Sequence, residues 1–207
     1  MTTPSRMDPG GVPVFSVSEA ELAGLAGKLA HRAEDECLLE VAYRIVDSPV
    51  GRLLLAATER GLVRVAFEQE GFDGVLSGLA GRLGPRILHA PWKLDQAAAE
   101  LDEYFAGRRR QFGVPLDFVL SHGFRLSVQQ RLPDIGYGRT MSYRQVAELL
   151  DRPGAVRAVG TACATNPLPV IVPCHRVLRS DGSLGGYLGG LEAKATLLAL
   201  EDRAVAA

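Results

Sequence analysis

The residues of this sequence best suited to chemistry are Cys174 and His175, which stand side by side in the run Pro173-Cys174-His175-Arg176-Val177. Apolar residues and proline fill positions 168–172, so we expect the cysteine at the end of a buried extended segment. The thiolate is the nucleophilic form of cysteine, and a neighbouring histidine that accepts the proton is a common way to generate it. The pair therefore predicts an activated nucleophile. The alternative is a buried structural cysteine beside a chance histidine.

Other segments strengthen the first interpretation. Around the cysteine run, in chain order, come Arg157-Ala158-Val159-Gly160, Asn166-Pro167, Gly186-Tyr187-Leu188-Gly189-Gly190 and the stretch from Lys194 to Glu201. In this order and spacing the chain resembles the O6-alkylguanine-DNA alkyltransferases, also called methylated-DNA–protein-cysteine methyltransferases. The resemblance covers roughly residues 40 to 201. It implies stoichiometric DNA repair, in which an alkyl group moves from O6-alkylguanine, and from O4-alkylthymine, to the protein's own cysteine. The implied partner is double-stranded DNA that contains alkylated guanine.

The resemblance also implies roles around the sulfur. Cys174 would be the alkyl acceptor, His175 the base that acts through a water, Glu201 the carboxylate that orients His175, and Asn166 a hinge between the recognition helix and the cysteine turn. From the residues alone, Glu201 is a surface residue near a helix end and Asn166 an Asn-Pro turn former. A charged partner favours a thiolate, so we predict that the pKa of Cys174 lies below its ordinary value of about 8.5. No metal and no cofactor are expected.

The family's substrate pocket implies further positions. Tyr143 would contact the phosphate of the flipped nucleotide. The far wall and base edge of the pocket would be formed by Val177, Tyr187, Leu188 and Gly189. We expect Cys163 at the pocket mouth as a small apolar residue and not as a second acceptor.

A helix-turn-helix is predicted before the cysteine run. Ser142 caps a helix to Leu150, residues 151–154 form a turn, and a second helix runs over about 154–164. This second helix carries small residues that we predict to contact DNA, namely Ala155, Ala158, Gly160 and Thr161. The resemblance places it in the minor groove and assigns Arg157 to the gap left by the flipped base. The alternatives are tight helix packing for the small residues and a surface salt bridge for Arg157.

The rest of the chain reads as a scaffold. Strands are predicted at 41–46, 52–57, 62–67 and 114–118, and helices at about 72–83 and 92–106. The expected fold is an α/β N-terminal domain, with a small antiparallel sheet and helices, followed by a mainly α, winged-helix-like C-terminal domain. We divide the chain into an extension (1–38), a scaffold domain (39–120) and a DNA-binding and alkyl-acceptor domain (121–207).

The extension carries its own prediction. Residues 1 to about 15 are expected to be disordered, and a capping box at Ser16 or Ser18 opens a helix whose Leu22, Leu25 and Leu29 share one face. Packing of this face on the scaffold is favoured over docking of a partner.

The composition limits the kind of DNA-binding surface and the cellular compartment that we expect. The formal net charge of −1 over 207 residues leaves no global basic field, so any DNA surface must be a local patch. Three cysteines without metal-like spacing indicate a reducing, cytoplasmic compartment. No apolar run reaches the ~20 residues of a membrane span. We expect a monomer, and we expect Arg108-Arg109-Arg110 to be a solvated loop.

Three alternatives remain. A Cys-His hydrolase would need an oxyanion hole and would turn over. A sequence-specific helix-turn-helix regulator would need base-reading side chains where this chain has alanines. A relative that binds alkylated DNA without repairing it would lack the cysteine.

Overall fold

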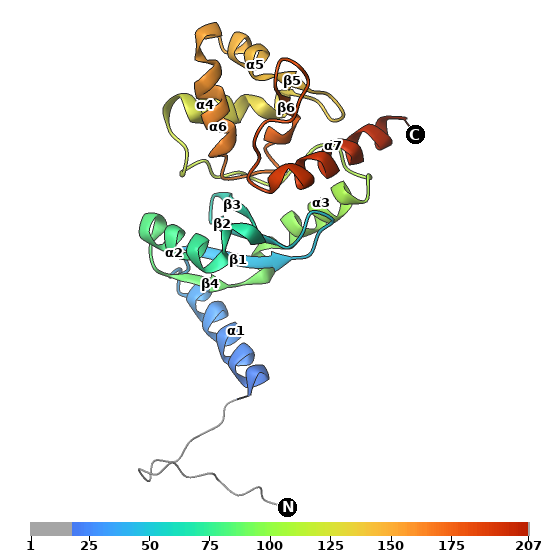
Figure 1. Ribbon diagram of the computed structural model, residues 1–207. Coiled ribbons are helices and arrows are strands. Elements are labelled where there is room, and N and C mark those ends of the chain that lie inside the picture. Colours follow the sequence, from blue (N-terminus) through green and yellow to red (C-terminus); the bar gives the residue numbers. More distant parts are fainter. Residues whose placement is uncertain (1–17, 207) are drawn as a thin grey trace, which may run out of the picture.

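A four-stranded sheet organises the first half of the protein, whose computed structural model describes residues 18–206 (Figure 1). Its order is β3-β2-β1-β4. The strands are β1 (Val41–Val46), β2 (Leu53–Thr58), β3 (Gly61–Phe67) and β4 (Ile87–His89). The first three are antiparallel neighbours, whereas β4 pairs with β1 in parallel.

The prediction of an antiparallel sheet is wrong for β4, whose parallel pairing with β1 makes the sheet mixed. The short β4, only three residues long, offers no alternation from which to predict it. The strand predicted at 114–118 is reduced to a single bridge between Leu62 and Leu116.

Both faces of the sheet are covered. The central strand β2 is buried on both sides, since Leu54 and Ala56 point into one cluster and Leu53 and Leu55 into another. Helix α2 (Phe72–Leu83) closes the first cluster through Leu79. The second cluster receives the short 3-10 helix η2 (Pro91–Leu94) and α3 (Asp95–Phe105) and continues without a break into the second half of the chain. One face of the sheet therefore packs against the second half of the chain.

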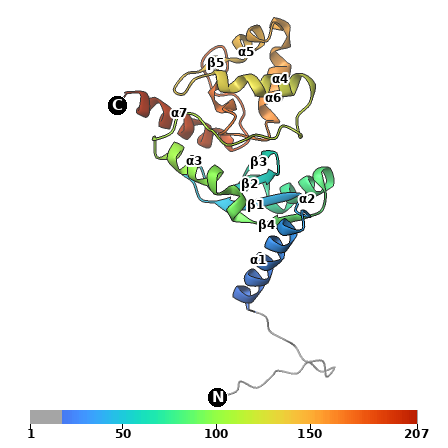
Figure 2. The same ribbon diagram turned by 180° about the vertical axis from the view of Figure 1, so that it is seen from behind.

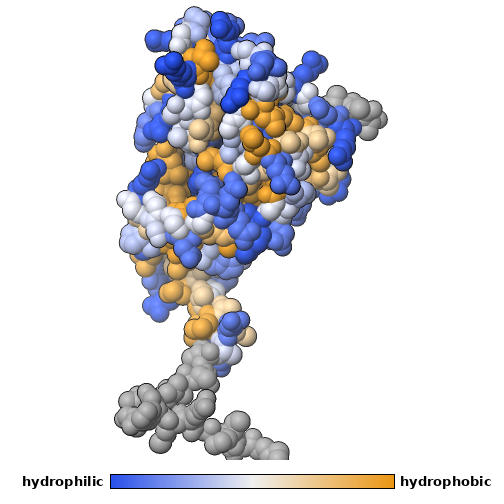
Figure 3. All heavy atoms as spheres, viewed as in Figure 1, coloured by the Kyte–Doolittle hydropathy of each residue, from blue (hydrophilic) through white to orange (hydrophobic). Residues whose placement is uncertain are grey.

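Helix α1 (Glu19–Asp35) begins at Ser18, whose hydroxyl and Glu21 form the predicted capping box. Only its C-terminal end packs on the body, where Ala30 is buried and His31 stacks on Trp92 at 3.7 Å between ring centroids. The packing expected for its leucine face is wrong, because Leu22, Leu25 and Leu29 are 55–59% exposed. The helix projects from the molecule with this apolar surface uncovered (Figures 1 and 3). The disorder predicted for residues 1–15, and Ser16 as a cap, lie outside the described residues.

The second half is mainly helical, as predicted. It contains α4 (Gly123–Arg131), α5 (Tyr143–Leu149), α6 (Val156–Ala164) and α7 (Gly190–Ala206). Ser142 caps α5 by accepting a hydrogen bond from the Gln145 amide, and a left-handed residue, Asp151 (φ 54°), turns the chain toward α6. A two-stranded parallel pair, β5 (Met141–Ser142) with β6 (Val177–Leu178), ties the start of α5 to the cysteine turn.

Among residues 18–206, no helix is long and apolar enough to cross a membrane.

Candidate active site

Cys174 begins the short 3-10 helix η5 (Cys174–Arg176). The preceding residues 168–172 are buried as predicted, but the extended conformation predicted for them is wrong, because they form turns in which the Val172 amide donates to the Leu168 carbonyl. Cys174 is 2% exposed. The Asn166 side chain donates from Nδ2 to Cys174 Sγ at 3.2 Å and to the Val172 carbonyl at 2.8 Å, while its Oδ1 accepts from the Leu168 amide. Asn166 therefore connects the segment that follows α6 to the cysteine turn and directs a donor at the sulfur.

His175 is fully buried beside the cysteine and lies against the carboxylate of Glu201 from α7. Its Nε2 is 2.9 Å from Glu201 Oε1. A carboxylate at that distance accepts the Nε2 proton, so Nδ1 carries the free lone pair of the neutral imidazole. Nδ1 is buried and has no hydrogen-bond partner among the residues that the structure describes. The structure thus pairs the histidine that directly follows the thiol with the predicted carboxylate, and the pair leaves Nδ1 as the basic nitrogen.

Glu201 holds more than the histidine. Arg176 donates to both of its oxygens, from Nε at 3.0 Å to Oε2 and from Nη2 at 2.9 Å to Oε1. The Tyr104 hydroxyl donates to Oε1 at 2.7 Å and the Gly138 amide to Oε2 at 3.1 Å. Arg176 and Tyr104 were not predicted. Arg176 lies within the cysteine run, but no sequence pattern indicates that it pairs with Glu201. Tyr104 comes from α3 of the scaffold half.

These contacts set the protonation states. Burial would raise the pKa of Glu201, but hydrogen bonds from His175 and Arg176 hold it at about 2. Burial lowers the pKa of His175 below 6.5, so the imidazole is neutral at pH 7. The predicted depression of the pKa of Cys174 is wrong. Burial raises it to about 11, and the Asn166 hydrogen bond and the charge of Lys194 offset only part of that effect. The resting nucleophile is a thiol, and its proton must leave during the reaction.

The predicted pocket wall lies next to this group. Tyr187 meets the His175 ring edge-on, with centroids 6.4 Å apart, and meets Phe67 of β3 at 5.5 Å. A Cβ added to Gly189 would come within 2.6 Å of the Phe67 ring, so only glycine fits there. Tyr143, half-buried at the start of α5, lies near both Cys163 and Cys174, and burial followed by those thiols raises its pKa.

Two carbonyls of the wall are held by side chains that the sequence did not single out. The buried Lys194 donates from Nζ to the Val177 carbonyl at 2.6 Å, and Gln69 donates to the Leu188 carbonyl. A carbonyl oxygen has two lone pairs, so a carbonyl that accepts one hydrogen bond from a side chain can accept a second from a ligand. The Gln69 contact comes from the scaffold half, so that half helps to position the wall.

The second helix of the helix-turn-helix separates two faces. Val159, Ala162 and Cys163 are buried against the body, whereas Arg157, Ala158 and Thr161 are exposed. Ala155 and Gly160 are half-buried, and a Cβ on Gly160 would meet nothing within 4 Å. The packing alternative therefore accounts for the inner face only. The outer face is smooth, and Arg157 forms no ion pair with any residue in the described part of the chain.

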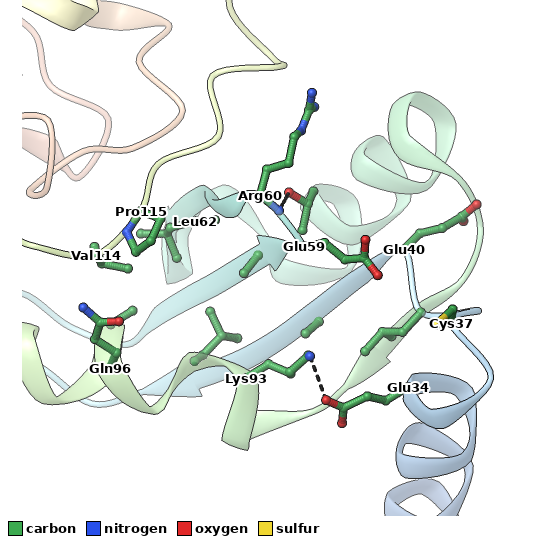
Figure 4. Close-up of a pocket in the computed structure, with 17 residues that line it drawn as sticks. Glu34, Cys37, Glu40, Glu59, Arg60, Leu62, Lys93, Gln96, Val114 and Pro115 are labelled. Carbon is green, nitrogen blue, oxygen red and sulfur yellow. Dashed lines mark hydrogen bonds and ion pairs between the residues drawn. The ribbon is translucent and has the colours of Figure 1, made fainter.

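A separate cavity of about 290 Å³ lies in the scaffold half between α1, the sheet and η2 (Figure 4). Its lining includes Glu34, Cys37 and Lys93 but none of the predicted site residues. Glu34 and Lys93 pair with each other at 2.7 Å. This cavity is not part of the candidate active site.

Comparison with known proteins decides the family. Residues 41–118 match the family model described as 6-O-methylguanine DNA methyltransferase, ribonuclease-like domain, and residues 123–203 match the model of the DNA binding domain of the same enzyme. The chain belongs to the 6-O-methylguanine DNA methyltransferase family. The first matched range corresponds to the sheet-containing half of the structure and the second to the helical half. The cysteine run and Glu201 both lie within the second range.

Relatives of this methyltransferase family match along most of the chain. A methylated-DNA–protein-cysteine methyltransferase of Mycolicibacterium paratuberculosis is 40% identical over 163 residues, which are 79% of this chain and 93% of that protein. The Escherichia coli protein Ada, named as a bifunctional transcriptional activator and DNA repair enzyme, is 35% identical over 195 residues, 93% of this chain but 53% of Ada. The crystal structure of Mycobacterium tuberculosis OGT in complex with DNA superposes with a TM-score of 0.70 at 37% identity, over 79% of this chain and 94% of that one.

Proposed function

We propose that this protein repairs DNA by transferring an alkyl group from O6 of guanine in duplex DNA to Sγ of Cys174, once per molecule. The observation that carries the proposal is the buried array of thiol, neutral histidine and carboxylate within a chain of this family. We extend the same chemistry to O4 of thymine, whose alkyl group is equally an ether carbon open to displacement.

The reaction forms the S–C bond as the C–O6 bond breaks. The electron pair of the broken bond leaves with the purine, which then takes up a proton to become guanine. The thiol proton passes through a water to Nδ1 of His175, and Glu201 stabilises the imidazolium that results. Arg176 keeps Glu201 ionised, so the negative charge of the carboxylate stabilises the imidazolium of His175. The Nδ2 donor of Asn166 supports the developing thiolate. Because the resting pKa of the thiol is about 11, proton removal belongs to the transfer step and is not complete before it.

Recognition of the base falls to the pocket wall. The free lone pairs on the Val177 and Leu188 carbonyls accept hydrogen bonds from the purine edge, and Lys194 and Gln69 fix their directions. The Tyr143 hydroxyl faces the departing purine and the phosphate of the flipped nucleotide. Tyr187 and Gly189 close the far side, since the tight fit of Gly189 on Phe67 leaves that loop little room to move.

DNA is held by the outer face of α6 in the minor groove. The small residues Ala155, Ala158, Gly160 and Thr161 allow a close approach of the helix to the duplex, and Arg157 enters the stack to replace the flipped base. We assign residues 1–38 to an extension, residues 39–120 to a scaffold domain, and residues 121–207 to the DNA-binding and alkyl-acceptor domain. A monomer working in the cytoplasm suits a protein whose three cysteines are all free thiols.

The direct test is intact mass after incubation with a duplex that contains one O6-methylguanine. One added methyl group per protein molecule, with no further turnover in excess DNA, is expected. Repeated turnover would instead support a hydrolase, and binding without any change in mass would support a non-repairing alkyl-DNA-binding protein.

A further inference from the structure

A second groove lies beside the candidate active site, where the two halves of the protein meet. Its volume is about 320 Å³. One wall is α2, and the other is formed by the start of α4 and the segment that follows α6. On the α2 side Gly74 and Gly78 carry no side chain, and a Cβ on either would meet nothing within 4 Å. The groove is therefore open beside these two glycines of α2.

The groove is strongly cationic in a chain whose formal net charge is −1. Arg64, Arg82 and Arg125 line it, and none of the lining residues is Asp or Glu. Arg64 is committed to an ion pair with Glu70. Arg82 and Arg125 are exposed, and neither has a carboxylate within ion-pair distance among the described residues. Two guanidinium groups from different halves of the protein thus line one groove without an anionic partner.

The groove continues the face of α6 that we assign to DNA. Thr165, which directly follows α6, lines the groove and is exposed like Arg157, Ala158 and Thr161. At 1.5 Å per residue, Thr165 lies about 12 Å along the helix from Arg157. That is about three to four base-pair steps of duplex, at 3.4 Å each. From opposite sides, Figures 1 and 2 both place α2 on the same side of the molecule as α4 and α6, away from the C-terminal end of α7.

We infer that this groove binds the phosphate backbone of the DNA duplex held by α6, with Arg82 and Arg125 as the phosphate ligands. This rests on the proposed function. Guanidinium groups recognise phosphate oxygens through paired hydrogen bonds, and phosphate contacts position a protein without reading sequence. Sequence-independent contact suits a protein that must inspect any guanine. It also gives α2, in the scaffold half, a direct part in holding DNA.

The test uses the full chain and an undamaged duplex of stated length, with affinity measured from low to moderate salt. The double variant Arg82→Gln, Arg125→Gln should bind at least about tenfold more weakly at low salt. The slope of log affinity against log salt should be shallower by about 1.8, since each lost phosphate contact removes about 0.9. Arg203→Gln removes one positive charge near the end of α7, against two in the double variant, from a residue in no ion pair within the described chain. It should leave affinity and slope unchanged, whereas the loss of a single groove contact would already lower the slope by about 0.9.

A double variant that keeps both positive charges distinguishes the loss of charge from a disturbance of the fold. The double variant Arg82→Lys, Arg125→Lys should retain most of the wild-type salt slope, because lysine still neutralises phosphate. Three results would overturn the inference: a wild-type slope in the glutamine variant, an equal loss in Arg203→Gln, or glutamine variants that bind DNA poorly only because their thermal midpoint has fallen. Transfer is measured on the same samples. If the wild-type protein takes no methyl group from DNA, the proposed function fails; if it does and the slopes agree, only this inference fails.

Discussion

Replacing Glu201 with glutamine should cost the protein a large part of its stability, because the carboxylate is the buried centre of four donors. Glu201 is 1% exposed and its main partner, Arg176, 5%. Glutamine has nearly the same shape but no charge, so it leaves the Arg176 guanidinium buried without a counter-ion. Removal of one partner from a buried ion pair typically costs about 3–5 kcal/mol.

The pKa of Glu201 gives a second route to the magnitude. The folded protein holds it at about 2, against 4.5 for the unperturbed side chain. Each pKa unit corresponds to about 1.4 kcal/mol, so ionised Glu201 contributes about 3 kcal/mol to folding. Because the folded value is the lower one, this contribution is complete above pH 4.5 and is lost as the pH falls toward 2. The two routes agree within their precision.

Urea unfolding at pH 7 measures the effect. We expect the midpoint of Glu201→Gln to fall by about 1–3 M, and its free energy of unfolding to lose the dependence on pH between 4.5 and 2 that the wild type shows. Asp202→Asn is the matched control, since the next residue of α7 is exposed and should change stability by less than about 0.5 kcal/mol. Equal midpoints for the two variants, or the same acid dependence in Glu201→Gln as in the wild type, would refute the reasoning.

Three further predictions concern the reaction itself. Arg157→Ala should slow repair of duplex DNA by about 10–100-fold, the equivalent of a few kcal/mol of unstacking, while alkylation by free O6-benzylguanine changes little; equal losses on both substrates would assign Arg157 to the pocket or the fold. The transfer rate should persist below pH 6.5 and fall only as His175 becomes protonated at its lowered pKa, so a rate that already falls at pH 7 would contradict the neutral-histidine assignment. The alkylated protein should melt below the free protein, because a carbon added to a buried thiol site costs about 1–3 kcal/mol; an unchanged or raised midpoint would count against this.

The sequence predicts best where the chemistry is contiguous. Cys174 and His175 adjoin, and Asn166 is only eight residues from the sulfur that it contacts, so the local order of residues carries the geometry. The helix-turn-helix could be predicted equally well, because Ser142 marks the start of its first helix and residues 151–154 mark the turn between its two helices. Glu201 rested on the family resemblance alone, since nothing in a glutamate near a helix end indicates burial.

Other features depend on distance along the chain or on burial. Tyr104 meets Glu201 across 97 residues, and no local pattern reveals such a pair. The parallel pairing of β4 is likewise set by tertiary packing and not by its three residues. The wrong direction for the pKa of Cys174 has the same origin. The sequence names the neighbours that favour a thiolate, but it does not show that the sulfur is buried deeply enough for desolvation to prevail.

The central claim is that Cys174 alone accepts the alkyl group, and peptide mapping after reaction with O6-methylguanine DNA tests it most directly. Cys163 lies near Cys174, is also buried, and is the natural competitor. The account predicts one methyl group on the peptide that contains Cys174, none on that of Cys163, and no transfer in a Cys174→Ser variant that still binds DNA. A methyl group on Cys163, or transfer that survives in Cys174→Ser, would contradict it.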